Sequence, residues 1–224
     1  IHVPKLRPDV AIVETTYGNR LHANRQVEER RLVELVRECT ACGQKVLIPA
    51  FALGRSQEVL LILRAAMQNE ELPSVPVYVD GMVRDINTVY TRNPTFLKNA
   101  LGKRILRGGE PFYTKEIQPV ASSQNREELL ETKGAAVIVS SSGMLTGGPS
   151  MQYAKKLVQS EDACIIITGY QDEESPGRQL LNLLENKEER KITLDGTTIP
   201  VKCRVEQVGP VSYTHLTLPT ICSV

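Results

Sequence analysis

Short apolar runs separated by longer helical patterns restrict the fold of this sequence more than any other feature. Runs typical of buried strands occupy residues 9–14, 45–51, 75–79, 135–139 and 164–168. Apolar positions at helical spacing fill residues 24–42, 53–67, 150–159 and 177–184. Because strands that alternate with helices usually form parallel pairs with both faces covered, the sequence predicts an α/β fold with a three-layer arrangement and a mostly parallel sheet.

Two regions depart from this alternation. Residues 82–123 indicate only short helices, around 86–90 and 96–101, and a looser stretch that contains Pro111 and Pro119. Residues 192–208 alternate around an Asp195-Gly196 turn, which is typical of a β-hairpin. We expect this hairpin to belong to another sheet.

Composition excludes several classes of protein. The chain has 224 residues, 41% of them hydrophobic, which is enough for one sizeable core. Its 27 basic and 26 acidic residues leave a net charge of +1, so any contact with nucleic acid must be local. The apolar runs are far shorter than the roughly 20 residues of a membrane span. We therefore expect no contact with a membrane.

The cysteines and the first residues indicate the compartment and the origin of the chain. Five cysteines lack the spacing of a disulfide framework, which favours reduced thiols and a cytoplasmic location. Cys39 and Cys42 have no second pair or nearby histidine that would complete a zinc site. The chain begins with Ile1, without an initiator Met or a targeting stretch, so we expect it to be a piece of a longer product.

Unusual segments follow four of the predicted strands. They are Glu-Thr-Thr-Tyr-Gly at 14–18, the block from Pro49 to Glu58, Ser-Ser-Ser-Gly-Met at 140–144 and Thr-Gly-Tyr-Gln at 168–171. Ligands of parallel α/β sheets bind beyond the carboxyl ends of the strands. The sequence therefore predicts that all four segments lie on one edge of the sheet.

These segments resemble the β-CASP branch of the metallo-β-lactamase-fold nucleases, which includes the RNA 3′-end processing endonuclease and its prokaryotic relatives. The resemblance spans residues 9–209 and is strongest in Glu-Thr-Thr-Tyr-Gly, where relatives usually have Ser at the second position, and in Phe-Ala-Leu-Gly-Arg-Ser-Gln-Glu at 51–58. Ser-Gly-Met at 142–144 and the Gly-Tyr pair followed by Gly177-Arg178 agree in order and spacing.

The resemblance implies a two-part enzyme that hydrolyses RNA. In this family a metallo-β-lactamase domain binds two zinc ions, and an inserted β-CASP domain covers the cleft. A metal-bound hydroxide attacks the phosphodiester, and the cations neutralise the transition state. The family's ligands form a His-x-His-x-Asp-His motif with a further His and Asp upstream of residue 14, and a late His. Because His2, His22 and His215 are the only histidines, we expect most zinc ligands to lie outside this chain.

The resemblance also divides the chain into parts. Residues 1–18 would end the N-terminal metallo-β-lactamase part, residues 19–187 would form the β-CASP domain, and residues 188–209 would return into the metallo-β-lactamase part. Residues 210–224 are similar to a translated sequencing adapter, so we interpret them as a non-native tail and do not assign His215 as a ligand. The alternative is a genuine, divergent strand.

Two residues are catalytic candidates through this resemblance. Glu14 occupies the family's first β-CASP motif, an acidic residue near the metals; the alternative is a carboxylate that caps the turn at 16–18. Gln179 stands where the eukaryotic 3′-end relatives have a histidine. Because a Gln side chain cannot act as a general acid near neutral pH, either a water takes this role or the register differs.

Other residues of the same segments are candidates for binding the substrate. Ser141, Ser142 and Gly143 offer hydroxyls and backbone N–H groups to a phosphate, unless they form a plain loop. A guanidinium of Arg55 or Arg178 would pair with a phosphate, unless it is only solvated. Asp80 is either a site residue or the N-cap of the next helix. The remaining candidates are Thr15, Tyr17 and Ser56.

The sequence thus indicates a fragment of a zinc-dependent ribonuclease with RNA as its partner. One alternative is a DNA-directed nuclease of the same superfamily. Another is a non-catalytic RNA-binding paralogue, which the glutamine at position 179 favours. No pattern in the sequence indicates an oligomeric state.

Overall fold

The computed structural model describes residues 9–10, 24–185 and 190–209. Its helices are α1 (Arg25–Ala41), α2 (Arg55–Gln68), α3 (Val83–Arg92), the 3₁₀ helix η1 (Pro94–Phe96), α4 (Asn99–Leu106), α5 (Ser123–Glu131), α6 (Gly148–Leu157) and α7 (Pro176–Glu185). Its strands are β1 (Lys45–Pro49), β2 (Val77–Asp80), β3 (Ile117–Pro119), β4 (Ala136–Ser140), β5 (Ala163–Ile167), β6 (Lys191–Leu194), β7 (Thr197–Pro200) and β8 (Arg204–Gln207). None of the helices in this described part combines the length and the hydropathy that a membrane crossing needs.

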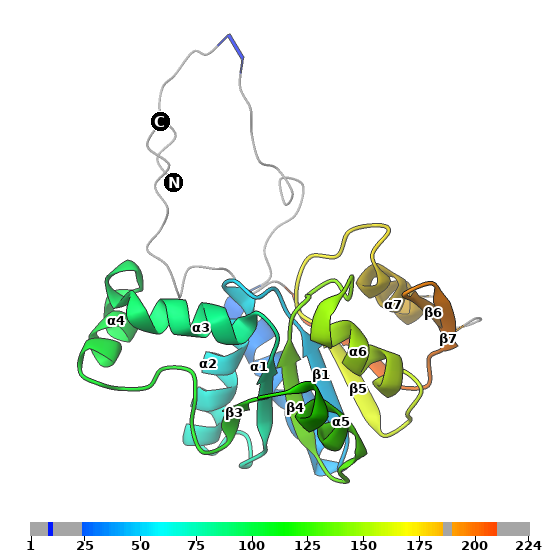
Figure 1. Ribbon diagram of the computed structural model, residues 1–224, viewed down its shortest axis with the longest axis horizontal. Coiled ribbons are helices and arrows are strands. Elements are labelled where there is room, and N and C mark those ends of the chain that lie inside the picture. The colour runs from blue at the N-terminus through cyan, green and yellow to red at the C-terminus, as the bar shows by residue number, and fades with distance from the viewer. Residues whose placement is uncertain (1–8, 11–23, 186–189, 210–224) are drawn as a thin grey trace.

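The strands form one parallel sheet and one hairpin. The sheet has six strands in the order β3-β2-β4-β1-β5-β8, and every neighbouring pair is parallel (Figure 1). β6 and β7 form a separate antiparallel pair. Asp195 and Gly196 connect them with φ angles of 51° and 71°, the left-handed conformation that a two-residue hairpin turn requires. The predictions of a mostly parallel α/β fold and of a hairpin in another sheet are confirmed.

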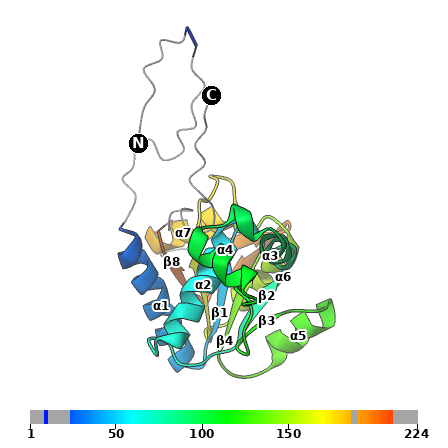
Figure 2. The same ribbon diagram turned by 90° about the vertical axis from the view of Figure 1, so that its left-hand side faces the viewer.

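The central strands are buried on both faces, which makes the fold three-layered. Alternate side chains of a strand point to opposite faces. In β1, Val46 and Ile48 join the core beneath α1 and α2, whereas Leu47 joins the core beneath α6 and α7. β4 and β5 alternate in the same way. Figure 2 shows α1 and α2 on one side of the sheet and α6 on the other.

Local signals explain where the first helices begin and end. The Asn24 side chain caps α1 by accepting a hydrogen bond from the Gln26 N–H at 3.0 Å. Gly43 follows the helix with a φ of +74°, which a glycine adopts without strain. The Gln57 side chain accepts from the Gly54 N–H at 2.8 Å and so caps α2. Both ends of α1 agree with the sequence prediction.

The last described residues return to the first helix. After β8, the Gly209 N–H donates to Glu28 Oε2 at 2.6 Å. Glu28 lies on α1 and its side chain is buried. Gly209 therefore lies beside the first turn of α1.

Several elements differ from the sequence prediction. β3 and α5 were not predicted, because Ile117 is the only buried residue of β3 and Leu129 the only one of α5, too few for a recognisable period. Residues 204–207, predicted as part of the hairpin region, pair in parallel with β5 as β8. The strand predicted at 9–14 lies outside the described residues apart from Asp9 and Val10, which form a bend.

Candidate functional site at the carboxyl edge

The loops after β1, β2, β4 and β5 lie on the same edge of the sheet, because these strands are parallel. β1 and β4 are neighbours, yet α2 packs on one face of the sheet and α6 on the other. The loop after β1 therefore leads to one face of the sheet and the loop after β4 to the other. Between two such loops lies a crevice, and ligands of α/β sheets bind at this point. Three of the four predicted segments meet at this edge, as predicted; residues 14–18 lie outside the described residues.

The loops after β1 and β4 are in direct backbone contact. The Ala50 N–H donates to the Ser140 carbonyl at 2.9 Å. A Cβ added to Gly143 would lie 2.7 Å from the Phe51 nitrogen and 3.0 Å from the Ala50 carbonyl carbon. Only a residue without a side chain permits this approach, since neither backbone can move cheaply. The glycine of the predicted phosphate loop therefore has a packing role.

The serines of this loop make contacts within the protein. Ser141 Oγ accepts from the Met82 N–H at 3.1 Å, which joins this loop to the one after β2. The Ser142 and Thr146 hydroxyls lie 3.0 Å apart. The Ser150 hydroxyl donates to the Ser142 carbonyl at 2.7 Å. Phosphate binding by Ser141 and Ser142 stays a prediction.

Gln171, which was not among the predicted site residues, holds the loop after β5 against the loop after β4. Its buried amide donates to the Gly143 carbonyl at 3.0 Å. A Cβ on Gly177 would lie 1.8 Å from Gln171 Oε1, so this position also depends on a glycine. The available signal was the place of Gln171 directly after a strand, in the segment 168–171.

The predicted residues of the β1–α2 block are buried. Arg55 is 3% exposed, and its Nη1 lies 2.8 Å from Glu58 Oε2. The Ser56 hydroxyl donates to the Phe51 carbonyl at 2.7 Å. A contact between Arg55 and RNA would require the guanidinium to leave Glu58, and it stays a prediction, as does a contact with Ser56.

The side-chain carboxyl of Glu58 has an unusually high pKa. Burial raises the pKa of its carboxyl from near 4.5 to about 7, against the opposing charges of Arg55 and Arg25. Arg25 Nη2 lies 3.7 Å from Glu58 Oε1. A carboxyl of this kind changes its charge near neutral pH.

Asp80 is the centre of a buried network. It accepts from Arg126 Nε at 2.7 Å, from the Tyr153 hydroxyl at 2.9 Å and from the Gly81 N–H at 2.6 Å. The N-cap of α3 is Met82, so the alternative role predicted for Asp80 as the N-cap is wrong. Burial and the Asp80 carboxylate raise the pKa of Tyr153. Neither Arg126 nor Tyr153 carried a local sequence signal.

Arg178 and Gln179 occupy the first turn of α7. Arg178 Nη2 donates to the Gln171 carbonyl at 2.8 Å, while its buried Nε has no hydrogen-bond partner among the described residues. Gln179 Oε1 accepts from the Thr193 N–H at 2.9 Å and so connects α7 with β6. Glu14, Thr15 and Tyr17 lie outside the described residues, so the shared edge predicted for Glu14 and Gln179 stays a prediction.

The described residues do not fit a zinc pair. Within the described ranges, no group of three or more His, Cys, Asp or Glu side chains is placed to hold a metal ion. His2, His22 and His215 fall outside these ranges. Cys39 is buried and Cys42 is exposed.

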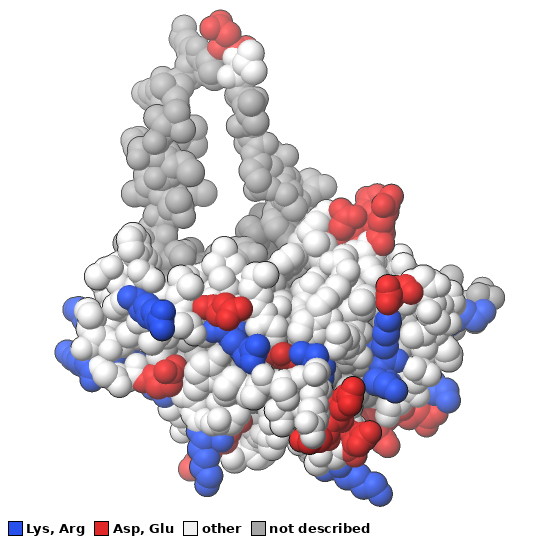
Figure 3. All heavy atoms as spheres, in the orientation of Figure 1, with Lys and Arg blue, Asp and Glu red and all other residues white. Residues whose placement is uncertain are grey.

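Charges of both signs are interspersed on the molecular surface, as Figure 3 shows for one face. Asp172, Glu173 and Glu174 are exposed in the loop after β5. Exposed apolar side chains also occur at this edge: Leu53 is 60% and Tyr170 42% exposed. A ligand at this edge would therefore meet carboxylate, hydroxyl, aromatic and apolar groups rather than a basic surface.

Comparison with known proteins agrees with the resemblance found in the sequence. The Beta-Casp domain family matches residues 56–180. Similar curated proteins include transcription termination factor FttA of Pyrococcus horikoshii, 35% identical over 203 residues that cover 89% of this chain and 31% of that protein. FttA of Methanocaldococcus jannaschii is 37% identical over 204 residues, which cover 89% of this chain and 32% of that protein. This chain thus spans about a third of the length of these relatives. Because the family match covers more than half of the residues, the chain belongs to the Beta-Casp domain family.

Proposed function

We propose that this chain is the β-CASP part of a metal-dependent ribonuclease, and that the carboxyl edge of its sheet forms one wall of the RNA-binding cleft. Membership of the Beta-Casp family supports a nuclease. The relatives named as transcription termination factors favour RNA over DNA, because RNA is the product of transcription. We propose a cytoplasmic location on the same grounds.

The observation that carries this proposal is the contact of the loops after β1, β4 and β5 at the switch point of the sheet. Gly143 packs on the Phe51 backbone, and Gln171 bonds the Gly143 carbonyl. This arrangement presents the hydroxyls of Ser142 and Thr146 and the exposed ring of Tyr170 along one edge. Hydroxyls bind phosphate oxygens, and aromatic rings stack with unpaired bases.

The zinc ions expected from the resemblance would be held by residues other than the described ones. Bound zinc would supply a hydroxide at neutral pH by lowering the pKa of a coordinated water. The part that we propose for this chain is to bind and orient the RNA. DNA as the substrate remains the alternative within the superfamily.

The proposal can be tested by placing a negative charge on the edge. Thr146 is exposed there, and Gln159 is exposed beyond the other end of α6. Thr146→Glu is expected to weaken binding of a single-stranded RNA about threefold or more through repulsion of phosphates, whereas Gln159→Glu should have no effect. Fluorescence anisotropy with labelled RNA measures both affinities. Equal affinities for the two variants, or no binding by the unaltered chain, would contradict the proposal.

A non-catalytic RNA-binding protein is the second candidate. The bond from Gln179 to the Thr193 backbone favours it, because it gives this side chain a structural partner at a position where some relatives have histidine. Both candidates predict RNA binding at the edge. Cleavage by the complete protein with zinc separates them, since only the ribonuclease turns over.

A further inference from the structure

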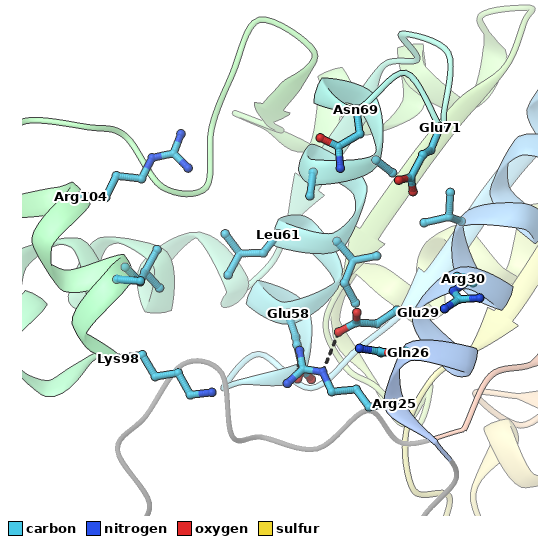
Figure 4. Close-up of a pocket in the computed structure, with 16 residues that line it drawn as sticks. Arg25, Gln26, Glu29, Arg30, Glu58, Leu61, Asn69, Glu71, Lys98 and Arg104 are labelled. Atoms are coloured by element: carbon cyan, nitrogen blue, oxygen red, sulfur yellow. Dashed lines mark hydrogen bonds and ion pairs between the residues drawn. The ribbon is translucent and has the colours of Figure 1, made fainter.

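A groove on the outer face of the molecule begins beside the carboxyl edge, outside the loops of the candidate cleft. It is formed by α1, α2 and α4 and has a volume of about 640 Å³. Figure 4 shows α2 between the other two helices, with Leu61 pointing into the groove. Arg25 and Arg30 line it from α1, and Lys98 and Arg104 from the α4 side. The groove is therefore bounded by cationic side chains on two sides.

Two of these cations are available to an anionic ligand. Arg25 is paired with Glu29 at 2.6 Å. In contrast, no carboxylate of the described residues lies within 4.0 Å of the guanidinium of Arg30 or Arg104. Both side chains are exposed, and they lie on opposite sides of α2 in Figure 4.

The floor of the groove differs from its walls. Leu61 and Ile62 are half-buried on α2 and present apolar surface to the groove. The side chain of Glu58 is only 2% exposed, and its Oε1 accepts no hydrogen bond from the described residues. Glu29 and Glu71 also line the groove, and Glu29 is already paired with Arg25. A groove with exposed cations on two sides and an apolar floor suits a chain with an anionic backbone and flat apolar bases.

The groove continues from the carboxyl edge. α2 follows β1 and begins at this edge, where Arg55 belongs to the predicted site. Glu58 lies one turn further on and contacts both Arg55, at 2.8 Å, and Arg25 of the groove, at 3.7 Å. One carboxyl thus connects the candidate cleft with the groove.

We propose that this groove is a second, sequence-independent RNA-binding tract, in which Arg30 and Arg104 contact phosphates of a single strand that extends out of the cleft. The inference rests on the proposed function, because it takes RNA as the ligand of the edge. The tract would increase the affinity for a longer RNA and leave that for a short one unchanged.

The test uses the 224-residue chain with two double variants of equal charge change. Arg30→Ala with Arg104→Ala removes the groove cations. Arg37→Ala with Lys103→Ala removes two exposed cations from the same helices outside the groove. Each is titrated with labelled single-stranded RNA of about 6 and about 20 nucleotides, lengths near the lower limit of and above the site sizes typical of single-strand tracts.

The groove variant is expected to bind the longer RNA about fivefold more weakly and to reduce the slope of log affinity against log salt by about 1.4, which corresponds to two lost phosphate contacts. The control should behave like the unaltered chain, and the shorter RNA should not distinguish them. Circular dichroism confirms that both variants are folded.

The outcomes separate this inference from the proposed function. If Thr146→Glu weakens RNA binding while the groove variant matches its control, the tract is refuted and the cleft stands. If both double variants weaken binding equally, net charge explains the effect and the tract is again refuted. If the unaltered chain binds neither RNA, both proposals fail.

Discussion

The buried amide of Gln171 joins two loops of the candidate cleft and sets a stability prediction. Gln171→Leu removes the only hydrogen bond to the Gly143 carbonyl that we find among the described residues, at 3.0 Å. Leaving a buried carbonyl unpaired costs about 1–3 kcal/mol of unfolding free energy. Urea unfolding measures this loss. Gln159→Leu is the control, because its amide bonds the Lys155 carbonyl at an exposed site where water can replace it; an equal loss in both variants would contradict the prediction.

The pKa of Glu58 makes the stability depend on pH. Its carboxyl has a pKa of about 7 in the folded chain, chiefly because of burial, against an ordinary value near 4.5. The native state therefore binds this proton more tightly than the unfolded chain, and its contribution to the unfolding free energy is present below pH 4.5 and is lost as the pH rises through about 7.

Glu58→Gln should remove this part of the pH dependence. Denaturant unfolding at a series of pH values from 4.5 to 7.5 is expected to give a flatter profile for the variant than for the unaltered chain. Glu34→Gln, whose side chain is 61% exposed, is the control and should keep the original profile. Parallel profiles for the unaltered chain and Glu58→Gln would show that this carboxyl does not titrate as described.

Helix α5 depends on one ion pair more than on packing. Leu129 is its only buried residue, and Figure 2 shows the helix at the margin of the molecule. Arg126 bonds Asp80 at 2.7 Å and Gln152 at 2.9 Å, and its guanidinium lies 5.8 Å from the centre of the Tyr153 ring. Helix α5 is therefore expected to unfold locally before the strands of the sheet do.

Arg126→Ala should release α5. It leaves the buried Asp80 without its counter-ion, so we expect a loss of about 3 kcal/mol of unfolding free energy. Hydrogen exchange of residues 123–131 should increase more than that of α6. Glu131→Ala, an exposed change in the same helix, should leave the exchange unchanged. Uniform acceleration across the whole chain would indicate global destabilisation instead.

Sequence periodicity predicted the elements that are buried along most of their length. β1, β4 and β5 are buried at nearly every position, and their apolar runs mark them clearly. β3 and α5 depend on single buried residues and on tertiary contacts, which no local pattern records. The same difference between local patterns and tertiary contacts decides which site residues could be predicted. The loops at the carboxyl edge follow from the strand order, whereas Arg126 reaches Asp80 across 46 positions.

The whole chain is predicted to be inactive as a nuclease. It has three histidines, and its described residues hold no metal-binding cluster. A dinuclear site needs more ligands of this kind, and without metals no hydroxide forms near neutral pH. We expect metal analysis of the purified chain to find no stoichiometric zinc pair, and RNA to stay intact with added zinc or manganese. Two bound metals with chelator-sensitive cleavage would refute this prediction and make His215 a candidate ligand.

The hydrogen bond from Gly209 to Glu28 has an architectural consequence. It holds the backbone of Gly209 against a side chain in the first turn of α1, at 2.6 Å from donor to acceptor, so the backbone enters and leaves this body close together. A unit with adjoining ends can be spliced into a single surface loop of a host fold without separating the strands on either side of that loop. For the same reason, a short linker between residues 24 and 209 should permit circular permutation, with new termini opened at the hairpin turn at Gly196.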